Sequence, residues 1–185
     1  KCSFALVLAS VTVDGDGLPH ATHLPYLYYD GRLDGHMAKS NPQWRHFQPG
    51  REVLTIFSGP HGYISPTWYP GEPNVPTWNY VTLHVYGIPR LIEDGGEKKA
   101  RQTRLVEAME RGFAKPWVMD LPAAYEQGML SGIVTFDIEI IRMEGKAKLS
   151  QNRKPEDLQG AITGLRATGR AEDAQLADLM ASSNA

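Results

Sequence analysis

The sequence predicts a mainly β fold with peripheral helices, in which six or seven mostly antiparallel strands close into a barrel. Three observations lead to this class. Apolar and polar residues alternate over long stretches, which is the pattern of half-buried strands. Short Asp-Gly turn sequences join the first stretches. Helical patterns come late in the order of elements along the chain. An antiparallel sheet with this many strands leaves no exposed edge strand when it closes into a barrel.

Composition indicates one domain over residues 1–185, since 42% of the residues are hydrophobic and 22% are charged. The formal net charge of -2 provides no broad positive field that would attract nucleic acid. The charge of the chain therefore does not support DNA as a partner. Cys2 is the only cysteine, which excludes an internal disulfide framework and favours a cytoplasmic protein. No apolar run approaches the ~20 residues that span a bilayer, so we expect no membrane segment.

Three strands open the chain. Their residues favour β structure, and the turn sequences DGDG and DGR indicate hairpins, so the three strands form a meander. Because the first strand begins almost at Lys1, we expect a short segment ahead of it. The predicted strands cover residues 4–13, 18–30 and 33–38.

A short helix from Pro42 to Phe47 follows the meander. Proline is favoured at a first helical position, where no N–H is needed, and Ser40 or Asn41 is suited to be the N-cap.

The middle of the chain alternates strands with an irregular loop. EVLTIFSG predicts a strand and GYISP a short edge strand. Three prolines within TWYPGEPNVP enforce an irregular loop ahead of a long alternating strand. These segments are residues 52–59, 62–66, 67–76 and 77–92.

Two helices and a strand come next. The charged segment EKKARQTRLVEAMER, residues 97–111, predicts a helix that ends before Gly112. A second short helix covers residues 122–129, and alternation predicts a strand over residues 133–150. The buried stripe of the first helix is predicted to be Ala100, Leu105, Ala108 and Met109.

Residues 153–185 predict a C-terminal helical extension packed on the barrel. It consists of two helical segments, residues 154–169 and 171–183. The first places Leu158, Ile162 and Leu165 on one face.

The strand that begins VPTWNY raises the question of a ligand. Side chains alternate across a strand, so one face is aliphatic and the other is rich in rings and hydrogen-bond donors. The ring-rich face is either a half-wet sheet surface or the floor of a site for a flat ligand. It holds Trp78, Tyr80, Thr82, His84 and Tyr86, whereas Asn79, Val81, Leu83, Val85 and Gly87 lie on the aliphatic face.

Several familiar sites are not supported by the sequence. His20 and His23 are three apart in a predicted strand and face opposite sides, so they cannot chelate one metal ion, and no second cysteine or acidic cluster adds ligands. The nucleophile motif GxSxG is absent, as are the phosphate loops GxGxxG and GxxxxGK[ST]. We therefore expect no metal.

GHMAKSNPQWR, residues 35–45, suggests an anion site. Lys39, the Ser40 hydroxyl and the free N–H groups of a helix that starts at Asn41 converge where a strand ends. The alternative is that Ser40 and Asn41 only cap the helix and Lys39 is solvated. Other strand ends, in SPTWYP, PTWNY and KAKLSQNR, also carry rings, amides and cations, and such positions face a ligand at a barrel rim.

Four ordered motifs carry a resemblance to a known family. They are HLPYLYYDGRLDGHMAKSNPQWR, GPHGYISPTWYP, VPTWNYVTLHVYG and EGKAKLSQNR. With them the chain resembles the PaiB family of FMN-binding negative transcriptional regulators, which belongs to the FMN-binding split-barrel group. The resemblance extends from Phe4 to about Leu165.

The resemblance implies a split β-barrel homodimer with FMN in a groove between the subunits. A dianionic phosphate needs charge-assisted donors, and a flat isoalloxazine needs ring surface with a few directed hydrogen bonds. For the phosphate we expect His36, Lys39, Ser40 and the Asn41 backbone. For the ring system we expect Trp78, Asn79 and Tyr80, and from the second subunit Lys146, Lys148, Ser150, Gln151 and Asn152.

Three functions follow from the resemblance. The chain is an FMN-binding homodimer of the PaiB type that acts as a regulator, or an FMN-dependent oxidoreductase that uses a reduced nicotinamide, or a flavin-free interaction dimer. No catalytic acid or base can be named from the sequence. No helix-turn-helix or basic face indicates direct DNA binding, and the basic stretch in residues 97–104 is expected to be a solvated helix face.

Overall fold

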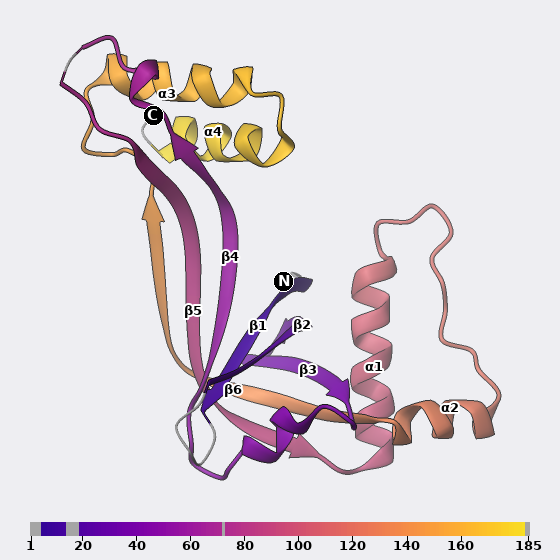
Figure 1. Ribbon diagram of the computed structural model, residues 1–185. Coiled ribbons are helices and arrows are strands. Elements are labelled where there is room, and N and C mark those ends of the chain that lie inside the picture. Colours follow the sequence, from indigo (N-terminus) through magenta and orange to yellow (C-terminus); the bar gives the residue numbers. More distant parts are fainter. Residues whose placement is uncertain (1–4, 14–18, 72, 184–185) are drawn as a thin grey trace. The chain divides into compact units, whose positions relative to one another are not determined.

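The computed structural model of the protein describes residues 5–13, 19–71 and 73–183 (Figure 1). It confirms a mainly β fold with peripheral helices. The strands are β1 (Ala5–Val13), β2 (Pro19–Tyr29), β3 (Arg32–Ala38), β4 (Val53–Ile64), β5 (Thr77–Ile92) and β6 (Ile133–Lys148). The helices are the 3₁₀ turns η1 (Pro42–His46) and η2 (Pro66–Trp68), and α1 (Gly95–Glu110), α2 (Ala123–Ser131), α3 (Pro155–Ala167) and α4 (Ala171–Ser183).

Strand pairing follows the order β1-β2-β3-β6-β5-β4, which closes as a barrel. The predicted meander is confirmed, because β1 pairs with β2 and β2 with β3, both antiparallel. β1 also pairs with β4, with Val11 opposite Leu54. The turn between β2 and β3 is confirmed too, since Asp30 and Gly31 have φ of 48° and 74°, as a tight hairpin turn requires. The DGDG turn at residues 14–17 lies outside the described residues.

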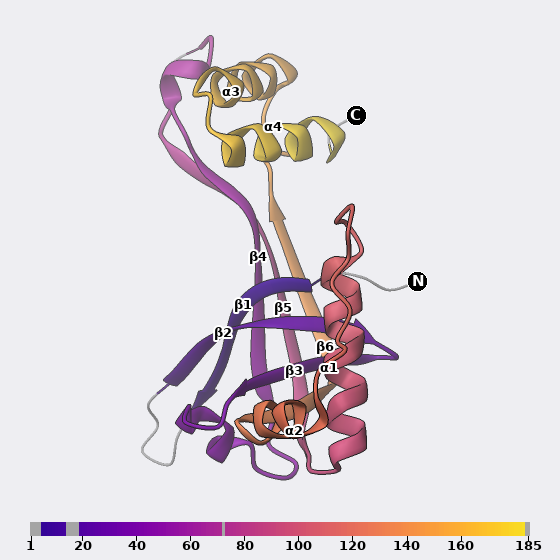
Figure 2. The same ribbon diagram turned by 90° about the vertical axis from the view of Figure 1, so that its right-hand side faces the viewer.

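The chain divides into two compact units. Unit 1 consists of Lys1–Phe57 and His84–Met143, and unit 2 consists of Ser58–Leu83 and Glu144–Ala185. The expected single domain over residues 1–185 stays a prediction, as does the packing of residues 153–185 on the barrel. Within unit 2, the helices α3 and α4 lie side by side (Figures 1 and 2).

Aromatic rings fill the inside of unit 1. Tyr26 meets Phe136 edge-on with 6.1 Å between ring centroids, and Phe47 meets Phe136 at 4.8 Å. Gly35 makes room for them, because a Cβ there would lie 2.7 Å from the Tyr26 ring. Strand β3 can therefore cross the aromatic cluster only with glycine at this position.

Helix α1 is held by charge, and its predicted buried stripe is confirmed only in part. Leu105 is buried and Ala108 is half-buried, but Ala100 is exposed and Met109 is 40% exposed. Arg101 lies in the interface between α1 and the sheet. Its guanidinium donates to Asp137 of β6 at 2.9 Å and to Asp34 of β3. The apolar pattern did not predict the buried face of α1, because this helix packs on the sheet through ion pairs.

The prediction of two strands between residues 52 and 66 is also wrong, because β4 runs without a break through Gly59 and Pro60. In the structure, a Cβ on Gly59 would lie 3.2 Å from the Val81 carbonyl oxygen. The glycine allows β5 to approach closely and does not mark a turn.

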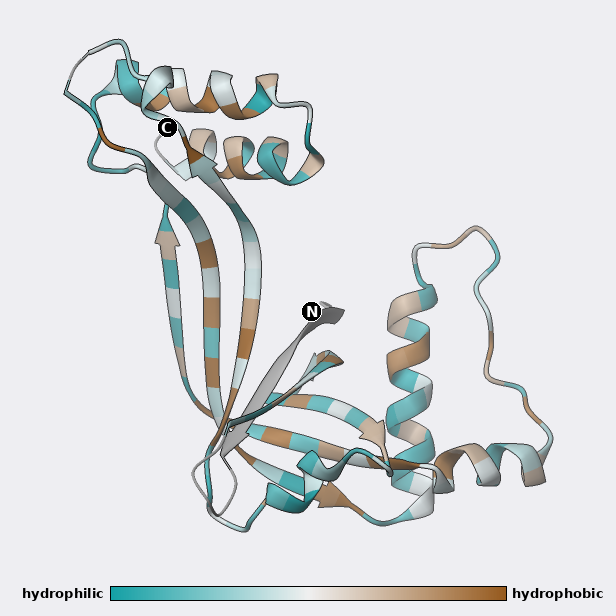
Figure 3. Cartoon of the chain, viewed as in Figure 1, coloured by the Kyte–Doolittle hydropathy of each residue, from teal (hydrophilic) through white to brown (hydrophobic). Residues whose placement is uncertain are grey.

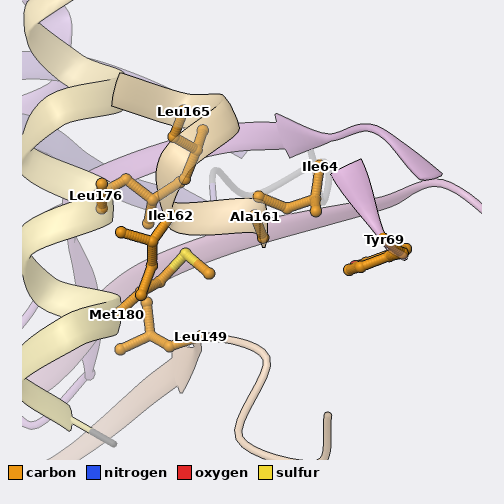
Figure 4. Packing of buried hydrophobic residues seen from close by; sticks show 9 residues of the cluster. Ile64, Tyr69, Leu149, Ala161, Ile162, Leu165, Leu176 and Met180 are labelled. Atoms are coloured by element: carbon orange, nitrogen blue, oxygen red, sulfur yellow. The ribbon is translucent and has the colours of Figure 1, made fainter. Parts of the chain in front are cut away.

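Unit 2 has an apolar core built by its two helices against strand ends (Figure 4). Ile162 and Leu165 are buried, as predicted, and Leu158 packs at the edge. Hydrophobic residues alternate along β5 (Figure 3), and its predicted bounds of residues 77–92 are confirmed. The core consists of Ile64, Tyr69, Leu149, Ala161, Ile162, Leu165, Leu176, Ala177 and Met180.

Candidate functional site

The site residues predicted from the sequence fall into two groups, one in each unit. The first group lies in unit 1, at the end of β3 and the start of η1: His36, Lys39, Ser40 and Asn41. The second group lies in unit 2, at the start of β5 and the end of β6: Trp78, Asn79, Tyr80, Lys146, Lys148, Ser150, Gln151 and Asn152.

Lys39 projects from a backbone that is fixed on both sides. Its N–H donates to the Gly132 carbonyl at 2.8 Å, and its carbonyl accepts from the Trp44 indole Nε1 at 3.2 Å. Lys39 and Ser40 are both exposed. The lysine ammonium group therefore extends into solvent from a rigid base.

Asn41 is the N-cap of η1. Its side-chain oxygen accepts from the Gln43 N–H at 2.9 Å, and its Nδ2 donates to the Thr22 hydroxyl at 3.0 Å. Its own N–H donates to the Ala38 carbonyl at 2.9 Å. The capping interpretation thus describes Asn41, whose donors are engaged within the chain.

His36 lies on the same face of β3 as Asp34, opposite Thr135 of β6 in the strand register. Its Nδ1 and the Thr135 hydroxyl are buried and have no hydrogen-bond partner among the described residues. Burial lowers the pKa of His36 below its ordinary value of 6.5. At pH 7 the ring is therefore neutral and adds no positive charge for a phosphate.

A pocket of about 300 Å³ opens beside Lys39 in unit 1. Its walls include the Trp44 ring and the apolar residues Leu91 and Ile133. Lys98 of α1 also lines it. An apolar wall beside two lysines, with Glu93 as the one acidic residue in the lining, suits an organic anion. No local signal in the sequence indicates Lys98, since it stands in a charged run that resembles any solvated helix face.

The second group centres on an exposed indole. Trp78 is 46% exposed, and its ring lies 5.8 Å from the His61 ring of β4 at an angle of 32°. The Lys146 ammonium group stands 5.7 Å from the centroid of the Tyr80 ring. His61 was not among the predicted site residues. Rings and cations thus share one surface, as expected from the alternation of β5.

Hydrogen bonds join the start of β5 to the end of β6. The Lys148 Nζ donates to the Trp78 carbonyl at 2.8 Å and to the Thr77 hydroxyl. Asn79, which is fully buried, donates from Nδ2 to the Ser150 hydroxyl at 2.8 Å. Its Oδ1 is buried without a partner in the part of the chain that the structure describes.

The turn after β6 is closed by its own side chains. Ser150 has a φ of 65°, a left-handed conformation that is uncommon outside glycine. Gln151 accepts from the Leu149 N–H at 2.8 Å and donates to the Ala147 carbonyl at 2.7 Å, while Asn152 is exposed. Ser150 and Gln151 therefore shape the turn.

Most cations in the basic stretch of α1 form ion pairs within unit 1. Lys99 pairs with Glu126 at 2.9 Å, and Arg104 pairs with Asp34 at 3.1 Å. Within residues 5–13, 19–71 and 73–183, no group of three or more histidine, cysteine, aspartate or glutamate residues is arranged to hold a metal ion. None of the helices in these ranges is long and apolar enough to cross a membrane.

Comparison with known proteins gives the family. Residues 4–142 match the family described as "Putative FMN-binding domain". Over 177 residues the chain is 38% identical to "Protease synthase and sporulation protein PAI 2" of Bacillus subtilis (strain 168), with 92% of this chain and 84% of that protein covered. The chain belongs to the PaiB family.

This PaiB-family chain is also similar to more distant proteins, in sequence or in fold. An uncharacterised protein of Emericella nidulans, AN0679, is 31% identical over 171 residues, with 76% of this chain and 68% of that protein covered. The flavocytochrome Anf3 from Azotobacter vinelandii matches with a TM-score of 0.60 at 16% identity, over 84% of this chain and 68% of that one. An FAD and heme binding protein from Mycobacterium smegmatis gives 0.59 at 16% identity, over 84% and 72%.

Proposed function

We propose that this PaiB-family protein is an FMN-binding homodimer, in which both groups of predicted residues serve the flavin. One observation carries the proposal: the Trp78 indole is exposed yet held in place, because Lys148 bonds to its carbonyl and His61 lies beside its ring. An exposed large ring on a fixed backbone is suited to contact a flat ligand. Membership of a family described as an FMN-binding domain supports FMN as that ligand.

The residues present fit the parts of FMN. Trp78 and Tyr80 supply ring surface, and Lys146 supplies a cation beside it. Lys39 and Ser40, which are exposed, supply donors for the phosphate. FMN, when bound, supplies the redox chemistry by accepting and releasing electrons.

Other predicted residues act by positioning. Asn79 and Ser150 join β5 to β6 with a buried hydrogen bond, and Gln151 closes the turn that follows. His36 and Asn41 support the end of β3, which lies next to Lys39. Asn152 is exposed and remains a candidate for direct contact.

The homodimer is supported by exposed apolar side chains of β6 in unit 1. Ile141 and Met143 are 53% and 59% exposed and lie two residues apart on one strand face. A second copy that covers them would remove this surface from water. Sedimentation equilibrium tests the dimer, and Ile141→Glu is expected to shift it toward the monomer.

A regulatory role is proposed from the relative named for protease synthesis and sporulation. The pairing of Lys99 and Arg104 within the chain leaves few free cations on α1 for direct DNA contact. Regulation through a protein partner then predicts no gel shift with promoter DNA beyond that with random DNA at physiological salt. A promoter-specific shift would instead establish direct binding.

Flavin binding can be tested on the purified protein. Denaturation should release a yellow fluorescent compound with the mass of FMN. Lys39→Glu should weaken FMN at least ~10-fold more than riboflavin, because the new charge opposes only the phosphate. A colourless protein that also fails to take up added FMN would favour the flavin-free dimer. Turnover of a reduced nicotinamide above the rate with free flavin would favour the oxidoreductase.

A further inference from the structure

The pocket beside Lys39 contains a second cation that comes from a different part of the chain. Lys98, in the first turn of α1, lines the same pocket as Lys39 and Trp44. Neither ammonium group has an ion pair or hydrogen bond among the described residues. One carboxylate, that of the exposed Glu93, also lines the pocket, so its lining side chains carry a net positive charge.

Lys98 differs from the neighbouring charged residues of α1, which are engaged. Lys99 pairs with Glu126 at 2.9 Å. Glu97 accepts from Arg101 at 2.7 Å and 3.1 Å, so the carboxylate next to Lys98 is already neutralised. A cation that is left unpaired while its neighbours are paired is available to a ligand.

Both cations project from ordered backbone. The Lys39 backbone is held by Gly132 and Trp44. The Lys98 N–H donates to the Asp94 carbonyl at 2.9 Å in the first turn of α1, whose cap is the Asp94 side chain. The pocket is therefore lined by cations whose main-chain positions need no rearrangement when an anion arrives.

We propose that Lys98 is a second phosphate-binding residue for FMN and contributes to its preference over riboflavin. The proposal rests on the FMN-binding function proposed above. A phosphate monoester carries about -1.5 to -2 charge at pH 7, more than one lysine neutralises. Because Glu93 lies in the same lining, Lys39 alone would leave the pocket without net charge, and Lys98 makes its net charge positive. Riboflavin has the same ring system and no phosphate, so it should not be affected by Lys98.

The test compares FMN and riboflavin binding to full-length variants by quenching of flavin fluorescence. Lys98→Gln is expected to weaken FMN ~10-fold or more and to leave riboflavin within about 2-fold. Lys98→Arg should retain FMN, because the charge is kept. Lys99→Gln is the matched control: it removes the same charge from the next residue of the helix, and FMN binding should stay within about 2-fold. Urea midpoints check that the variants are folded.

The outcomes separate the two proposals. If the wild-type chain fails to bind FMN at all, the FMN-binding function is wrong. If the wild-type chain binds FMN but Lys98→Gln and Lys99→Gln have equal effects, the phosphate role of Lys98 is wrong and FMN binding stands. Equal loss of FMN and riboflavin in Lys98→Gln would likewise reject a phosphate role.

Discussion

The two units dock their helices by different physics. In unit 1, α1 attaches to the sheet through Arg101, which reaches two aspartates on neighbouring strands. In unit 2, α3 and α4 attach through an apolar cluster that includes Leu165 and Leu176. Charge pairing is selective and depends on every member, whereas apolar packing depends on volume. We call these attachments the ionic dock of unit 1 and the apolar dock of unit 2. Different substitutions and conditions should therefore detach the helices of the two units.

The ionic dock of unit 1 is a network. Asp34 and Asp137 face each other in the β3–β6 register and are 5% and 0% exposed. Four arginines share these two carboxylates, so neither aspartate is left uncompensated. They are Arg32, Arg90, Arg101 and Arg104.

The largest effect is expected from Asp137→Ala. It removes a carboxylate that three arginines contact and leaves Arg101 buried with a partner missing, which should lower the free energy of unfolding by about 3–5 kcal/mol. Urea denaturation measures the loss. Hydrogen exchange should show that α1 loses protection while α3 and α4 keep theirs. A loss below about 1 kcal/mol would mean that the network does not hold α1.

Leu165→Ala tests the apolar dock in the opposite way. Leu165 is 0% exposed between α3 and α4, and the cavity should cost about 2–5 kcal/mol. Protection should fall in α3 and α4 and persist in α1. If α1 amides exchange as fast as those of α3, the two docks are one cooperative structure and the comparison fails.

Gly164→Ala should destabilise unit 2 by overpacking. A Cβ at this position would lie 2.2 Å from the Trp68 ring, and such crowding costs about 1–3 kcal/mol. Gly128→Ala is the matched control, because nothing lies within 4 Å of a Cβ on Gly128 in α2. It should stabilise by up to about 1 kcal/mol through helix propensity. Urea midpoints that move in the same direction would contradict this packing account.

Acid should weaken the ionic dock and spare the apolar one. Burial raises the pKa of Asp137, but the hydrogen bond from Arg90 and the charges of Arg101, Arg90 and Arg32 outweigh it, so the pKa lies below 3.8. A carboxyl with a lowered folded pKa contributes stability above its unfolded pKa and loses it as pH falls through the folded value. Wild-type stability should therefore decline below about pH 4 more steeply than that of Asp137→Asn. Parallel pH profiles would contradict the assignment.

The smallest effect is expected at an exposed ion pair. Arg166 of α3 donates to Asp178 of α4 at 2.8 Å, with side chains 53% and 72% exposed. Arg166→Gln should change unfolding free energy by less than about 1 kcal/mol. Thermal denaturation checks it. A loss near that of Asp137→Ala would show that burial does not separate the two kinds of ion pair.

Periodicity predicted the elements well and their docking unevenly. The bounds of β5 and the apolar face of α3 follow from local alternation, and both are confirmed. The buried side of α1 could not be predicted, because Arg101 is buried only by virtue of Asp34 and Asp137, which are distant in the sequence. A single arginine in a charged run has no local signature of burial.

The sequence motifs predicted some residues of the candidate site but not the contacts between them. Motifs indicated Lys39 and Trp78, both of which are exposed where a ligand can reach them. They did not indicate that Asn79 is buried against Ser150, or that Lys98 lines the Lys39 pocket. Those facts depend on which strand and helix ends meet, and this is decided by tertiary packing.

We propose above that the chain binds FMN as a dimer. Titration of the wild-type protein with FMN, followed by flavin fluorescence and sedimentation equilibrium on the same sample, tests it most directly. We expect saturable binding of one FMN for each chain in a particle of twice the chain mass. A monomer that leaves flavin fluorescence unchanged at saturating FMN would contradict it.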